Sequence, residues 1–197
     1  MARSVALLVC LSALSASAAA AAPGLEQLLQ LGSDDAQGSV TWGVSLTEIQ
    51  QVYAGSAGST SSDAVPGLLF VTTVADVGCE YKVYFYRGSD SDRLTGVRLE
   101  HAAGPLAECR ARIEQLLQRM YGTPSTTRTE AGWRRVTSNG TSSGPIVFSS
   151  WQTKAACIKL AAKEGAGYPG SPLAVTLGDL RGGCGYDDEV VRVRPRP

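Results

Sequence analysis

The sequence predicts an α+β fold in which one or two helices pack against an antiparallel sheet. Strand-like segments occur in runs joined by short turns, and a segment with helical periodicity precedes each run. A parallel α/β sheet would instead alternate single strands with helices. The same order is compatible with two degenerate copies of one helix-plus-meander unit, at residues 40–102 and 103–197.

Residues 1–22 have the features of a secretory signal peptide. Arg3 is followed by an apolar run of roughly ten residues and then by alanines, and such a run is too short to cross a bilayer. A lipoprotein signal that acylates Cys10 is the alternative, although Val9 stands where those signals carry a small residue. We therefore expect a bacterial protein exported to the periplasm or secreted, with residues 23–197 forming one domain without membrane insertion.

Two helices are expected before the first strands. The segment "GLEQLLQLG" at residues 24–32 has the pattern of a short amphipathic helix. In "WGVSLTEIQQVYAG", Ser45 or Thr47 can cap a second helix, and Glu48 follows Ser45 at the spacing of a capping box. The apolar positions on one face of this helix are Leu46, Ile49 and Tyr53.

Three strand-like runs follow, "GLLFVTTVADV", "CEYKVYFYR" and "LTGVRLEH", and "GSDSD" joins the last two as a hairpin loop. The alternation of the second run puts one set of side chains on one face: Cys79, Tyr81, Val83 and Phe85. In the third run the corresponding set is Val97, Leu99 and His101. An antiparallel meander is the simplest arrangement of these runs.

The periodicity then changes from two residues to 3.6. The segment "GPLAECRARIEQLLQRMYG" predicts a helix that has Pro105 in its first turn and ends before Gly122 and Pro124. Its apolar face contains Leu106, Cys109, Ile113, Leu116, Leu117 and Met120. The last third is strand-like again, with "GWRRVTS", a candidate tight turn at Asn139 and Gly140, "IVFSSWQTKAACIKLAAK" and "LAVTLGD".

The four cysteines beyond the leader are Cys79, Cys109, Cys157 and Cys184. An even number in an exported chain favours two disulfides, for which three connectivities exist. Cys79 opens a strand and Cys109 lies on the apolar face of the helix that follows, so we favour this pair and, by remainder, Cys157 with Cys184. Structural zinc is a weaker alternative because no two cysteines have the close spacing of a zinc-ligand pair.

Cys157 could also act as a nucleophile activated by His101, the single histidine of the chain. A free thiol at Cys157 would leave another cysteine unpaired, which is unfavourable in an exported protein. The alternation of "AACIKL" puts this cysteine on the face opposite to Ala156, Ile158 and Leu160. We therefore expect it to join two segments of the chain.

We expect no cofactor and no metal, because the sequence has no phosphate-binding glycine loop, no G-x-S-x-G motif and no paired-histidine zinc motif. The acidic residues 187–189 lack the spacing of a calcium loop. Carboxylates such as Glu80, Glu100 and Glu108, or His101, leave a small secreted hydrolase as the alternative function.

The balance of charge argues against a polyanionic partner. The chain has 18 basic and 18 acidic side chains, whereas proteins that bind nucleic acid or anionic membranes present a basic surface. Lys82, Tyr84 and Tyr86 share the face of their strand opposite to Tyr81 and Phe85. If this face is open to solvent, it suits a protein or glycan partner; the alternative is that a second layer covers it.

The segments "WGVSLTEIQQVY", "LTGVRLEH", "LLQRMYGTP" and "GWRRVTS…WQTKAACIKL" together resemble a loose class of uncharacterised exported bacterial proteins. The layout is also similar to the helix-plus-antiparallel-sheet modules of the β-lactamase inhibitor protein and of small outer-membrane assembly lipoproteins. This resemblance implies a fold, and it assigns no catalytic residue. The sequence thus predicts a non-enzymatic exported domain that binds an unknown protein or envelope component through a sheet face, or else a purely structural envelope protein.

Overall fold

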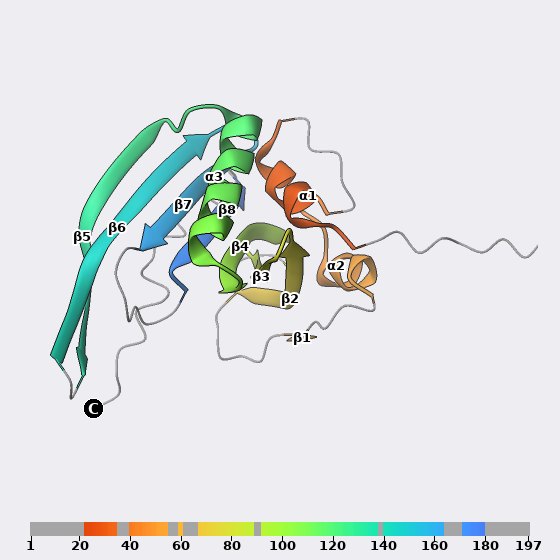
Figure 1. Ribbon diagram of the computed structural model, residues 1–197. Coiled ribbons are helices and arrows are strands. Elements are labelled where there is room, and N and C mark those ends of the chain that lie inside the picture. The colour runs from red at the N-terminus through yellow and green to blue at the C-terminus, as the bar shows by residue number, and fades with distance from the viewer. Residues whose placement is uncertain are drawn as a thin grey trace, which may run out of the picture.

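The computed structural model describes residues 22–34, 40–54, 59–60, 67–88, 92–137, 140–163 and 171–179, apart from the side chains of residues 59–60 and 131–143. Its strands form one antiparallel sheet in the order β1-β2-β3-β4-β8-β7-β6-β5. The helices all lie on one side of this curved sheet (Figure 1). The predicted α+β class and the antiparallel meander are therefore confirmed.

The first half of the chain contains α1 (Leu25–Leu29), a 3-10 turn η1 (Gln30–Gly32), α2 (Leu46–Val52), β1 (Ser59–Thr60), β2 (Leu68–Asp76), β3 (Cys79–Arg87) and β4 (Leu94–Ala103). The second half contains α3 (Leu106–Tyr121), β5 (Thr126–Thr137), β6 (Gly140–Gln152), β7 (Ala156–Lys163) and β8 (Leu173–Asp179). Each half ends in a meander, and the two last strands, β4 and β8, pair with each other. Whether the halves are copies of one unit remains a prediction.

Strand β7 presents different side chains on its two faces. Its side chains alternate as the sequence predicts, with Ala156, Ile158 and Leu160 buried toward the helices and Cys157 on the opposite face. Strand β3 (Cys79–Arg87) alternates in the same way, because successive side chains of a strand point to opposite faces of the sheet. The register of these strands defines an inner face, which contacts the helices, and an outer face.

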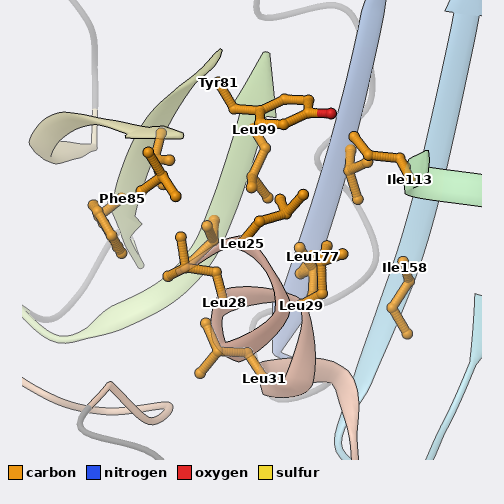
Figure 2. Close-up of a cluster of buried hydrophobic side chains, with 14 of the residues drawn as sticks. Leu25, Leu28, Leu29, Leu31, Tyr81, Phe85, Leu99, Ile113, Ile158 and Leu177 are labelled. Atoms are coloured by element: carbon orange, nitrogen blue, oxygen red, sulfur yellow. The ribbon is translucent and has the colours of Figure 1, made fainter. Parts of the chain in front are cut away.

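The core lies between the inner face and the three helices (Figure 2). Leu28 and Leu29 of α1 are 0% exposed, and their side chains lie among those of Leu99 and Leu177 from the central strands. A helix of five residues is too short to be stable alone, so this tertiary burial holds it in place. The predicted capping box of α2 is also present, since the Ser45 backbone N–H donates to Glu48 Oε2 at 2.7 Å.

Helix α3 crosses the inner face and is attached at both ends. Near its start, Cys109 forms the predicted disulfide with Cys79, which by the chain-entropy model stabilises the fold by about 3 to 4 kcal/mol. Near its end, Trp151 Nε1 donates to the Gly122 carbonyl at 2.9 Å. Arg112 on its flank pairs with Asp76 at 2.9 Å, which raises the pKa of the guanidinium mainly through that hydrogen bond. The helix is therefore fixed to both halves of the sheet.

Three sequence-based expectations were wrong in detail. The stretch from Ile146 to Lys163 is two strands rather than one continuous run, because Thr153 makes a turn: its Oγ1 accepts from the Ala156 N–H at 3.0 Å and donates to the Gly32 carbonyl at 2.7 Å. Strand β5 begins at Thr126, six residues before the predicted start. Leu106 is 38% exposed, because it lies in the first turn of α3, before the first buried position of that helix.

Candidate partner surface

Lys82, Tyr84 and Tyr86 lie on the outer face of β3, as the alternation predicts. The two tyrosine rings are stacked, with centroids 6.4 Å apart and planes 21° apart. Lys82 Nζ lies 6.0 Å from the centroid of the Tyr84 ring. Lys82 is exposed and both tyrosines are half-buried. The three side chains therefore form one contiguous aromatic and cationic patch.

Strand β4 adds an ion pair to this patch. Arg98 is opposite Tyr84 in the register, and Glu100 is opposite Lys82. Arg98 Nε donates to Glu100 Oε1 at 2.8 Å. We call the set Lys82, Tyr84, Tyr86, Arg98 and Glu100 the outer-face cluster.

The Tyr84 hydroxyl also belongs to this network. Burial raises its pKa to about 12, and the negative charge of Glu100 and a hydrogen bond to that carboxylate add to the effect. The raised pKa keeps the Tyr84 phenol protonated beside the Glu100 carboxylate.

A second aromatic site lies further along the outer face. Phe148 of β6 has Lys159 Nζ 4.6 Å from its ring centroid and the Arg128 guanidinium at 5.3 Å. Arg128 also pairs with Glu130 at 2.9 Å. The sequence pattern did not identify this site, because it depends on which strands are neighbours, and only the register of β5, β6 and β7 brings these residues together.

The outer face differs in exposure between its two halves. On the β2 and β3 side, Thr73, Ala75 and Lys82 are exposed. On the β6 to β8 side, Phe148 and Ala174 are buried. Within the described residues, α1, α2 and α3 pack on the inner face, so no described helix covers the outer-face cluster.

His101 lies on the inner face at the end of β4, opposite Tyr81. Its Nε2 is 3.2 Å from the Gly104 carbonyl, and its ring meets the Tyr81 ring edge-on at 6.4 Å. Cys157 lies on the outer face of β7, and β8 separates that strand from β4. A nucleophile–base pair of Cys157 and His101 is therefore incompatible with this geometry.

The carboxylates named as hydrolase candidates do not form one group. Glu80 is exposed on β3, Glu100 is bonded to Arg98, and Glu108 is in the first turn of α3. Among the residues that the structure describes, no group of three His, Cys, Asp or Glu side chains could hold a metal ion. Within the same residues, no helix is long and apolar enough to span a membrane.

Cys79 and Cys109 form the disulfide that the sequence favours. Cys157 is also disulfide-bonded. Its predicted partner, Cys184, lies outside the described residues, as do Asn139 and the acidic residues 187–189. The Cys157–Cys184 pairing thus remains a prediction.

Comparison of this chain with protein-family models, with curated proteins and with solved structures found no match.

Proposed function

We propose that this protein is an exported, non-enzymatic domain that binds another protein of the cell envelope through the outer-face cluster. The observation that carries this proposal is the stacked Tyr84–Tyr86 pair on the sheet face opposite to the three described helices. The leader pattern and the disulfide-bonded cysteines support an oxidising compartment outside the cytosol.

The chemistry of the cluster indicates the kind of partner. Tyrosines are enriched among the residues that dominate binding energy in protein interfaces, because they bury a large ring and keep a polar hydroxyl. Here the two rings already stack on each other, so less side-chain entropy is lost on binding. Arg98 and Glu100 neutralise each other, which does not favour a polyanion. The fitting partner is a protein that packs an apolar side chain on the tyrosines and places a carboxylate near Lys82.

Site-specific photo-crosslinking in the native host tests this proposal. A benzophenone amino acid replaces Thr73, which is exposed on the outer face directly opposite Lys82. The same probe at Gln115, exposed on α3, is the control for the helical side. We expect one reproducible crosslinked protein from position 73, none from position 115, and loss of the crosslink in the Tyr84→Ala/Tyr86→Ala variant.

Once the crosslinked partner is purified, its Kd for this protein and for variants of this protein can be measured. Lys82→Glu and Tyr86→Ala should each raise Kd about tenfold or more. A tenfold change corresponds to a loss of about 1.4 kcal/mol of binding free energy, as expected for a residue that contributes to an interface. Lys154→Glu makes the same charge change at an exposed residue of the β6–β7 turn and should leave Kd unchanged. Equal crosslinking at both positions, no crosslink at either, or an unchanged Kd would refute the proposal. A hydrolytic activity lost in His101→Ala but kept in Tyr86→Ala would instead support the hydrolase alternative.

A further inference from the structure

Strand β5 (Thr126–Thr137) is the last strand of the sheet, and Figure 1 shows it at the rim of the molecule. Among the strands that the structure describes, it pairs with β6 alone. The backbone N–H and C=O groups that point away from β6 therefore have no strand beside them within the described elements. Such an edge can accept a further strand through main-chain hydrogen bonds.

The side chains at the start of β5 are exposed on both faces of the strand. Thr127 and Thr129 point to the inner face, because Thr127 is opposite Ser149 and Ser149 is opposite the buried Leu160. Both threonines are nevertheless exposed, as are all of residues 125–130. The described helices thus do not cover this part of β5, and a second strand can approach its edge from the side. Threonine also favours the extended conformation.

The outer face of the same stretch carries two opposite charges. Arg128 and Glu130 are two positions apart and form an ion pair at 2.9 Å, with side chains that are 60% and 49% exposed. The Arg128 guanidinium also lies 5.3 Å from the centroid of the Phe148 ring. The ring and the carboxylate position this guanidinium at the edge of the sheet, and its exposure leaves room for a second carboxylate.

These charges select one register for pairing of β5 with a copy of itself. In an antiparallel pair about a twofold axis, the numbers of opposed residues have a constant sum. If the axis passes through Thr129, Arg128 is opposite Glu130 of the partner subunit, and the reverse contact forms by symmetry. An axis through Arg128 or through Glu130 instead puts like charges opposite each other, which is destabilising.

We propose that this protein forms a homodimer in which the β5 edges of two copies pair antiparallel about Thr129, so that one continuous sheet runs through both copies. The register irregularity between Ala131 and Trp133 limits the regular pairing to residues 127–131. The contact uses the same edge on both copies, so it closes at two subunits. The inference is independent of the proposed partner surface, because β3 and β5 are at separate places in the sheet.

Cysteine crosslinking of the full chain tests the register. A cysteine at position 129 would face its own equivalent with Cα atoms about 4.5 to 5.5 Å apart, a separation that a disulfide can bridge. Thr127→Cys is the matched control, since Thr127 is also an exposed threonine of the inner face. In the same register its equivalent is four positions along the paired strand, about 14 Å away.

We expect mild oxidation to convert Thr129→Cys to a covalent dimer, and to leave Thr127→Cys at the background of the natural chain. Absence of the dimer from Thr129→Cys would overturn the proposal. Equal yields from the two variants would also overturn it, because they would report random collision rather than one register.

Sedimentation equilibrium tests the charge pairing without a crosslink. Arg128→Glu should raise the dimer Kd about tenfold or more, because two attractive pairs become two repulsive ones. The swapped chain Arg128→Glu/Glu130→Arg should restore dimerisation, since each pair is attractive again. Lys154→Glu makes the same change of charge at an exposed residue of the β6–β7 turn and should leave the dimer Kd unchanged.

A natural chain that sediments as a monomer at its highest soluble concentration would refute the dimer. A swapped chain that is as weak as Arg128→Glu would refute the Arg128–Glu130 pairing across the axis. An unchanged circular dichroism spectrum in each variant excludes unfolding as the cause of a weaker dimer.

Discussion

At the scale of single residues, two glycines allow segments of the chain to approach closely. Gly104 has φ +103°, and a Cβ there would lie 2.5 Å from the Gly78 carbonyl oxygen and 3.1 Å from Cys109 Sγ. A Cβ on Gly32 would lie 2.7 Å from Tyr121 Oη and 2.9 Å from Ile158. Gly104 thus permits the turn that brings α3 next to β3, and Gly32 permits the N-terminal segment to pack on the sheet.

Gly104→Ala should lower the free energy of unfolding by about 3 kcal/mol, since the left-handed strain and the overlap with Gly78 act together. Gly43→Ala is the matched control, because Gly43 has φ +85° but a Cβ there has no neighbour within 4 Å. It should lose about 1 to 2 kcal/mol from strain alone. Urea unfolding measures both values, and equal losses would show that the contact with Gly78 contributes nothing.

At the scale of elements, the short N-terminal helix stabilises the fold through its buried leucines. Its contacts reach α3, through an Arg119–Glu26 ion pair at 2.6 Å and a hydrogen bond from the Tyr121 hydroxyl to the Leu29 carbonyl. The segment that follows the helix reaches the β6–β7 turn, where the Ala155 N–H donates to Asp34 Oδ1 at 3.0 Å. The element therefore connects parts that are distant in sequence.

Leu28→Ala should cost about 2 to 5 kcal/mol of unfolding free energy, as expected for a fully buried leucine. Gln27→Ala, at the adjacent exposed position of α1, should cost less than about 1 kcal/mol. The measurement is again urea unfolding. A similar small loss for both variants would mean that α1 is dispensable for the core.

The elements also show what the sequence could and could not predict. Strand β3 and α3 were predicted well, because clean periodicity and flanking turn residues are local signals. The turn at Thr153 was missed, because its hydroxyl bonds to Gly32, a contact that depends on the tertiary fold. In the candidate site, alternation identified Lys82, Tyr84 and Tyr86, whereas Arg98 and Glu100 needed the register between β3 and β4.

At the scale of the whole molecule, several tyrosine hydroxyls are buried in the fold, which favours their protonated form. Burial is the first cause in each case, and it raises the pKa of Tyr81, Tyr84 and Tyr121 to about 12. Burial also raises the pKa of Tyr53. The folded protein therefore holds these protons more tightly than the unfolded chain, where tyrosine has a pKa of about 10.

This difference predicts alkaline destabilisation. The contribution of the protonated phenols to the free energy of unfolding is fully present below about pH 10. Stability should fall as the pH rises from about 10 through about 12, because the unfolded chain releases the protons first. Thermal unfolding between pH 8 and pH 12, together with phenolate absorbance, measures the effect. Tyr84→Phe should remove one of the late-titrating phenols. Titration of all tyrosines near pH 10 in the folded protein would contradict this expectation.

The pairing of β4 with β8 has a consequence for how the chain reaches its fold. Leu99 pairs with Val175, so the centre of the sheet joins segments that are made at very different times during synthesis. Contacts between distant segments slow folding, because a long loop must close before they form. Until residues 173–179 are available, β4 has an unsatisfied edge in the middle of the future sheet. The chain therefore completes its sheet late, and an incomplete chain exposes a central strand that can pair with another molecule.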